Sequence, residues 1–187
     1  ASQDERNRIA SVLIDLTLRE LFEFGVTQSD PNFANYRYNA DTGKIILLDF
    51  GATRYLDPAL METYRDLMRA GLAADAEGLR AAAIRMKFID GEGPFDARIL
   101  SMIDAVFAAI REGGSFNFSD RTLSNRLTRE GTALAEAGYV PPPLPMDSLY
   151  LQRKFGGMFL LADRLGARVP VRDQIERFLG QVDFGAS

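Results

Sequence analysis

The stretch QSDPNFANYRYNADTGKIILLDFGATRY, residues 28–55, contains the two segments of this chain that most resemble β-strands. Residues 35–39 and 44–49 are short runs rich in aromatic and aliphatic side chains. Between them, residues 39–43 supply the Asn, Asp and Gly side chains that hairpin turns favour. The pattern predicts one short β-hairpin near the N-terminus of the chain.

Three polar residues, Asp30, Asn35 and Asp49, lie around the open end of this predicted hairpin. Because a hairpin brings its two open ends together, Asn35 and Asp49 are expected to lie close in space. Oxygen ligands that converge from two backbone segments suit a divalent cation such as Mg²⁺. Kinase-like enzymes use an Asp-x4-Asn segment and a following Asp-Phe-Gly in this order for phosphoryl transfer. Each residue alone is compatible with an ordinary turn, and the three together favour a phosphoryl-transfer site.

The rest of the chain has the apolar periodicity and the cap residues of helices. Before the hairpin, Ser2 and Glu5 form a capping-box pair and Gly25 is a natural stop, which predicts one helix there. After the hairpin, Asp57 followed by Pro58 marks a helix start. Helices are predicted at residues 58–73, 76–89, 95–111, 119–137, 147–165 and 171–180. The predicted fold is a single, mainly α domain: a helical bundle with one small hairpin and no internal repeat.

Composition excludes several classes of function. The 187 residues suffice for one well-buried domain, and 47% of them are hydrophobic. The chain has no cysteine and no histidine, which excludes disulfides, thiolate sites, a Ser-His-Asp triad and a histidine general base. The net charge is -4 and the cations are scattered, so no nucleic-acid partner is expected. No apolar run is long enough to cross a bilayer, and no signal peptide is visible.

Several segments of this chain resemble the UbiB family of atypical, protein-kinase-like proteins linked to coenzyme Q (ubiquinone) biosynthesis. LRELFEFG at residues 18–25 leads into QSDPNFANYRYN at 28–39 and KIILLDFGATR at 44–54, which are similar to that family's catalytic loop and metal-binding turn. Further family-like segments follow in the family's order: RMKF, YVPPP and RKFGGMFLLADRLGARVP. The similarity runs over about residues 18–172.

The resemblance implies roles for the three polar residues and a place for the chain in a larger enzyme. It makes Asp30 the catalytic aspartate, and Asn35 and Asp49 the ligands of Mg²⁺ and, through it, of ATP. The nucleotide loop and phosphate-pairing lysine of a kinase N-terminal lobe are not found in residues 1–187. The whole chain is therefore expected to be the helical C-terminal lobe of a kinase-like domain, with the N-terminal lobe absent. Such a fragment should be inactive by itself, whereas the full-length protein should be an enzyme.

The short segment after Gly51 bears on the substrate. Only six residues separate Gly51 from Pro58, where protein kinases place a long activation segment that serves as a platform for a peptide. A small or lipid-like substrate, or ATP hydrolysis alone, is therefore favoured. The resemblance implies a phosphotransferase or ATPase that supports ubiquinone biosynthesis from the cytoplasm, peripherally at the inner face of a membrane, with lipid precursors and other biosynthesis proteins as partners.

Two other functions stay open. One is a nucleotide-sensing pseudokinase or scaffold of a biosynthetic complex, and the other is a small-molecule kinase of the aminoglycoside or choline type. The retained polar residues favour an active enzyme over a scaffold, and the C-terminal family segments weigh against a small-molecule kinase.

Three further features have both a functional and a structural interpretation. Arg54 could reach a phosphate, or it could form a surface salt bridge. Arg153-Lys154 could bind a phosphate or a partner, or the following glycines could allow close helix packing. Phe116 and Phe118 could touch a membrane, or they could fold back onto the core. In each case the structural interpretation is the simpler one.

Overall fold

The computed structural model describes residues 2–28, 33–48 and 53–180, which form a mostly helical body. The helices are α1 (Gln3–Arg19), α2 (Pro58–Leu72), α3 (Ala76–Arg85), α4 (Asp96–Arg111), α5 (Thr122–Glu136), α6 (Met146–Leu165) and α7 (Val171–Gly180). The strands form three antiparallel pairs: β1 (Val26–Gln28) with β4 (Thr53–Tyr55), β2 (Tyr36–Asn39) with β3 (Lys44–Leu47), and β5 (Phe116–Asn117) with β6 (Arg168–Val169).

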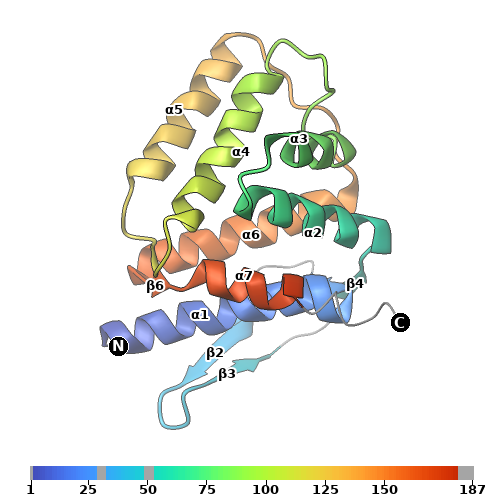
Figure 1. Ribbon diagram of the computed structural model, residues 1–187. Coiled ribbons are helices and arrows are strands. Elements are labelled where there is room, and N and C mark those ends of the chain that lie inside the picture. The colour runs from blue at the N-terminus through green and yellow to red at the C-terminus, as the bar shows by residue number, and fades with distance from the viewer. Residues whose placement is uncertain (1, 29–32, 49–52, 181–187) are drawn as a thin grey trace.

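The helices form two groups, and the hairpin extends away from both. Figure 1 shows α1, α6 and α7 side by side across the middle of the molecule, with α2, α3, α4 and α5 stacked on one side of them. The β2–β3 hairpin extends from the opposite side, next to α1. Asn35, the described residue of the predicted site, lies directly before β2 at the open end of this hairpin.

The mainly α class is confirmed, but the chain has more strand pairs than the sequence predicted. The pairs β1–β4 and β5–β6 were not expected. In the described residues from 57 onward, the strands β5 and β6 have two residues each and the regular structure is otherwise helical. Strands of two or three residues are too short to show an alternating pattern, which explains why the sequence did not indicate them. Helix α3 also ends earlier than predicted, because Lys87 adopts a left-handed conformation with φ of 59°.

The helix that leads to the site begins and ends where its cap residues predict. Ser2 Oγ accepts a hydrogen bond from Glu5 N at 3.2 Å, and Ser2 N donates to the Glu5 carboxylate at 2.7 Å. This capping box starts α1. The helix then widens into one π-helical turn, η1 (Glu20–Phe24), and stops at Gly25, whose φ is 61°. Gly25 thereby directs the chain into β1 and toward the predicted catalytic loop.

The main core lies between the two groups of helices. It is made of aliphatic and aromatic side chains from α1, η1, α2, α3, α4, α6 and α7, and its buried members include Leu18, Leu21, Phe22, Leu67, Met68, Leu79, Phe107, Leu151, Ile175 and Phe178. A second buried cluster joins α1, α6 and the β5–β6 pair. Phe118 belongs to this second cluster and packs near Phe116, so these two aromatics fold back onto the core, as the simpler interpretation predicted.

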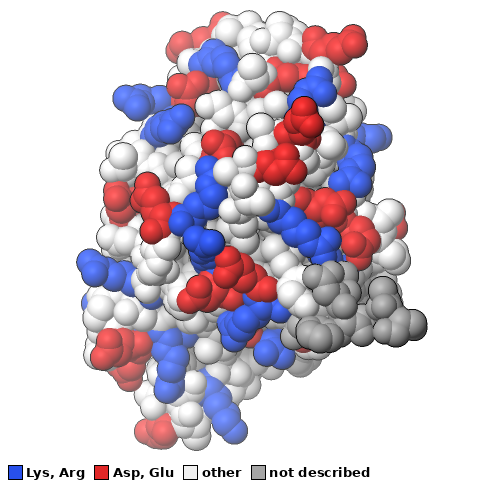
Figure 2. Space-filling view, viewed as in Figure 1, with Lys and Arg blue, Asp and Glu red and all other residues white. Residues whose placement is uncertain are grey.

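Charged side chains of both signs are mixed on the face shown in Figure 2. Many of the described charges form exposed pairs, such as Arg172 Nε with Glu176 Oε1 at 2.8 Å and Arg177 Nη2 with Asp15 Oδ1 at 3.2 Å. Exposed pairs of this kind contribute about 0–1 kcal/mol each, so the apolar core dominates the stability. In the three described ranges, every helix is too short or too polar to span a bilayer.

Replacing Gly71 of α2 with alanine should destabilise the fold. A Cβ at this position would lie 2.3 Å from Cγ of the buried Phe107 ring on α4, so the ring would have to move. Overpacking of this kind costs about 1–3 kcal/mol, against about 1 kcal/mol gained from helix propensity. Urea denaturation would measure the net loss.

Gly131→Ala on α5 is the matched control, because an added Cβ there meets no described atom within 4 Å. It should stabilise the chain by up to about 1 kcal/mol. Equal effects of the two substitutions would show that Phe107 does not limit the space at Gly71.

Candidate functional site

Of the three predicted site residues, the structure describes Asn35. Asp30 and Asp49 lie outside the described residues. Asn35 is half-buried and is the last residue of a 3₁₀ turn, η2 (Phe33–Asn35), directly before β2. In the described part of the chain, no three acidic side chains gather into a possible metal site. The metal prediction therefore depends on the two aspartates.

Two pairs of residues in the described backbone flank the predicted site. At the open end of the hairpin, Asn35 O accepts a hydrogen bond from Leu48 N at 2.8 Å, which extends the β2–β3 ladder by one position. At the other side of the site, Gln28 is the partner of Thr53 in the β1–β4 pair. The two segments that carry the predicted aspartates therefore begin and end at the same two pairs of residues.

A tyrosine links the end of β1 to the start of β2. Tyr36 Oη donates a hydrogen bond to Gln28 Oε1 at 3.3 Å. Burial, and secondarily the negative charge of Glu20, raises the pKa of Tyr36 to about 12. The phenol is therefore neutral at physiological pH and keeps its proton for this bond.

A buried ion pair holds β1 against α6. Lys154 of α6 is 1% exposed and Glu20 of η1 is 9% exposed, and the Lys154 ammonium donates to Glu20 Oε2. Burial lowers the pKa of Lys154, although the Glu20 charge acts in the opposite direction. The same Glu20 oxygen accepts a hydrogen bond from Thr27 Oγ1 at 3.3 Å and a long one from Gln28 N at 3.5 Å. The ion pair thus contacts the two residues of β1 that precede the predicted catalytic loop.

The same helix also holds β4. Arg54 Nε lies 3.5 Å from Asp147 Oδ1, and the Arg54 guanidinium carbon lies 4.8 Å from the centre of the Tyr150 ring. Asp147 and Tyr150 both belong to α6. The salt-bridge interpretation of Arg54 is confirmed. Helix α6 therefore supports both strands that flank the site, β1 through Lys154 and β4 through Arg54.

Sequence reasoning missed the Glu20–Lys154 pair. The phosphate interpretation of Lys154 is wrong, because its ammonium is buried against Glu20. The close-packing interpretation of α6 fails at Gly156, where an added Cβ would meet no described atom within 4 Å. One signal was present in the sequence: Lys154 lies at helical spacing between the apolar Leu151 and Met158, where a charge needs a buried partner.

Raising the pH above 10 should weaken the fold through Tyr36. The phenol titrates near 10.0 in the unfolded chain and near 12 in the folded one. Between these values the folded state binds more protons than the unfolded state, so the free energy of unfolding falls as the pH rises. Tyr36→Phe should make this fall shallower in urea titrations at several alkaline pH values, and equal slopes would contradict the assigned burial.

Comparison with known proteins identifies relatives over most of the chain. Residues 1–83 match the model of the ABC1 atypical kinase-like domain. Over 180 residues the chain is 35% identical to the mitochondrial atypical kinase COQ8B of Rattus norvegicus, covering 92% of this chain and 33% of that protein. Over 178 residues it is 34% identical to the mitochondrial atypical kinase COQ8 of Saccharomyces cerevisiae, covering 90% of this chain and 34% of that protein. The chain thus spans about a third of the length of these curated relatives.

A solved structure shares the fold. The structure titled as a complex of Rv3197 with erythromycin from Mycobacterium tuberculosis superposes with a TM-score of 0.73. The superposition covers 95% of this chain and 44% of that one at 17% identity, so it supports a common, kinase-like fold and nothing finer. The family model and the sequence relatives show that the chain belongs to the ABC1, or UbiB, family of atypical kinase-like proteins.

Proposed function

We propose that this chain, residues 1–187, is the helical C-terminal lobe of a UbiB-type atypical kinase or ATPase and supplies the metal ligands of its Mg-ATP site. Asn35 and Asp49 bind the cation, and Asp30 orients the attacking hydroxyl or water. The observation that carries this proposal is the double pairing of Gln28 with Thr53 and of Asn35 with Leu48. It supports a common site for both aspartate-bearing segments.

The residue types fit a magnesium ion bound together with phosphates. The amide oxygen of Asn35 and the carboxylate of Asp49 are hard donors, and Mg²⁺ in nucleotide sites uses one or two such ligands besides phosphate oxygens and water. When bound, the cation would neutralise charge on the phosphates. The protein's own part would be to position the groups: Asn35 and Asp49 would hold the cation, and Asp30 would accept the proton of the nucleophile.

The segment directly after the site favours a non-peptide substrate. Strand β4 pairs with β1 immediately after the Asp-Phe-Gly segment, Leu56 is buried, and α2 begins at Pro58. The described residues between 53 and 58 thus contain no platform for a peptide of the kind that a protein kinase uses. A small or lipid-like acceptor, or water, fits this arrangement better.

The relatives support a role in ubiquinone biosynthesis. Those from rat and yeast are named mitochondrial atypical kinases of the COQ8 type. We extend the ubiquinone role of the UbiB family to the full-length protein, with ATP, lipid precursors and other biosynthesis proteins as partners and with a peripheral position at a membrane. The word mitochondrial in the relatives' names gives no support to the cytoplasmic placement expected from the sequence.

Isolated residues 1–187 should bind Mg-ATP no more tightly than about millimolar, or roughly -4 kcal/mol. A kinase-like lobe that provides only metal ligands lacks the groups that grip the base and the phosphates from the other side. Isothermal titration with Mg-ATP would measure the affinity. Micromolar binding by the isolated chain would contradict the half-site proposal.

Turnover by the full-length protein separates an enzyme from a nucleotide-sensing scaffold. An enzyme should release phosphate from ATP, and Asp30→Asn should stop the release while nucleotide binding persists. A full-length protein that binds Mg-ATP without turnover would instead support the pseudokinase alternative.

A further inference from the structure

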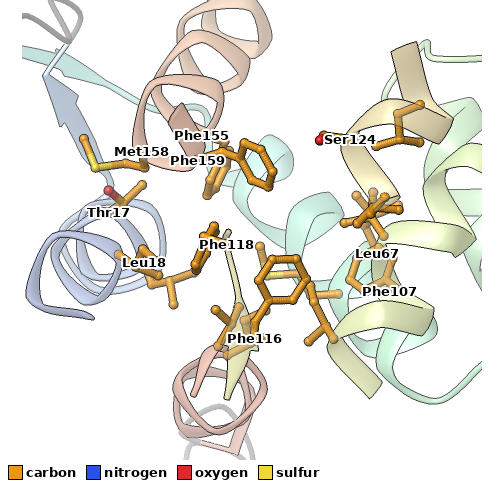
Figure 3. Close-up of a pocket in the computed structure, with 18 of the residues that line it drawn as sticks. Thr17, Leu18, Leu67, Phe107, Phe116, Phe118, Ser124, Phe155, Met158 and Phe159 are labelled. Carbon is orange, nitrogen blue, oxygen red and sulfur yellow. The ribbon is translucent and has the colours of Figure 1, made fainter. Parts of the chain in front are cut away.

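A cavity of about 530 Å³ lies within the helical body (Figure 3). Its walls come from α1, α2, α4, α5, α6, α7 and the β5 region. Sites for small molecules commonly measure about 300–1,000 Å³, so this volume is large enough for a ligand. Asn35 is not among the described residues that line it.

Aromatic rings form one side of the cavity. The ring centres of Phe116 and Phe118 are 4.7 Å apart, and those of Phe118 and Phe159 are 5.5 Å apart. Figure 3 shows these rings facing an open space, with Leu67 and Phe107 on the other side. Every wall therefore offers mainly carbon surface to an occupant.

The hydroxyl groups of the walls are mostly occupied by their own helices. Thr17 Oγ1 donates to Leu13 O at 2.9 Å, Ser124 Oγ donates to Arg121 O at 3.2 Å, and Thr128 Oγ1 donates to Ser124 O at 2.9 Å. None of the described wall residues is charged. An occupant thus needs no charge and few polar atoms of its own.

Tyr64 is the exception among the wall residues. It is 5% exposed, and its hydroxyl has no hydrogen-bond partner among the described residues. Burial raises the pKa of Tyr64, so the phenol stays neutral and keeps a proton to donate. Because this hydroxyl is itself buried, it offers an occupant of the cavity no accessible donor.

Helix α5 forms one wall of the cavity. Leu134 is its buried residue, whereas Leu123 and Leu127, which line the cavity, are half-buried. The helix packs mainly against α4. An engineered apolar cavity of about 150 Å³ stays dry and binds benzene, and the volume here is several times larger. The apolar walls give an ordered water few polar partners, so they favour a hydrocarbon occupant.

We propose that this cavity binds one uncharged alkyl chain of a lipid-like molecule. The volume, the aromatic wall, the occupied hydroxyls and the absence of charge on the described wall residues select this class of ligand for a cavity that is partly open to solvent. The proposal goes beyond the nucleotide site and does not depend on it.

The test uses N-phenyl-1-naphthylamine as a fluorescent probe and dodecanol as a competitor, both added to this chain. One probe should bind per chain, and dodecanol should displace it. Leu127→Trp, which fills the cavity from α5, should weaken probe binding about tenfold or more. Leu160→Trp on α6 is the control, because Leu160 is 59% exposed and does not line the cavity, and it should leave binding unchanged.

A second measurement does not rely on filling the cavity. Because the chain has no cysteine, Leu127→Cys and Leu160→Cys each introduce a single thiol. Dodecanol should slow maleimide labelling at position 127 and leave position 160 unaffected.

Three results would overturn the proposal. The first is equal probe affinity of the two tryptophan variants together with equal labelling rates. The second is uptake of several probes per chain. The third is a chain dimer that Leu127→Trp dissociates, which would show that a second copy covers this region.

Discussion

Replacing Lys154 with methionine should lower the free energy of unfolding by about 3–5 kcal/mol, because breaking a buried ion pair leaves an uncompensated charge. Glu20 would keep its hydrogen bonds from β1 but would lose its only cationic partner among the described residues. The methionine retains most of the apolar length of the lysine, so little of the loss comes from packing. Urea denaturation of the two chains would measure the difference.

Two further variants separate the ion pair from general damage to the fold. Adding Glu20→Leu to Lys154→Met should restore much of the lost stability, since it removes the unpaired charge. Arg172→Met, which breaks an exposed pair with Glu176, should cost no more than about 1 kcal/mol. If Lys154→Met cost as little as Arg172→Met, the pair would not be the buried anchor of β1.

In the full-length protein, Asp49→Asn should abolish metal-dependent binding of ATP. The substitution keeps the size and one oxygen of the side chain but removes the negative charge that faces the cation in the proposed site. Because Asn35 is neutral, Asp49 supplies the charge of the proposed ligand pair. Isothermal titration with Mg-ATP would compare the variant with the wild-type protein.

Asp41→Asn gives a control in the same hairpin. Asp41 is exposed in the turn between β2 and β3, and its substitution removes one negative charge far from the open end of the ladder. It should leave the affinity for Mg-ATP unchanged. Equal losses in the two variants would assign the effect to overall charge, and no loss in either would remove Asp49 from the site.

Local chemistry in the sequence was enough to predict where most helices begin and end. Ser2 with Glu5, Gly25, and Asp57 with Pro58 act within a few residues of themselves, and the structure uses each of them. The order of Asp30, Asn35 and Asp49 is local information of the same kind, and the site that it indicates stays a prediction.

Contacts between distant segments could not be predicted in the same way. Glu20 and Lys154 are separated by 134 positions, and nothing near either residue specifies the other. Phe116 and Val169 likewise pair across the chain in strands of two residues each. A buried charge indicates that a partner is required, but packing of whole helices decides which residue it is.

The attachment of both β1 and β4 to α6 also determines how this region opens. Since Lys154 and Asp147 lie on one continuous helix, the two strands share a single rigid support. Neither strand can leave the helical body without also breaking its hydrogen-bond ladder with the other strand. The backbone amides of Thr27 and Arg54 should therefore exchange with solvent deuterium as one cooperative unit, with a single free energy of opening for both strands.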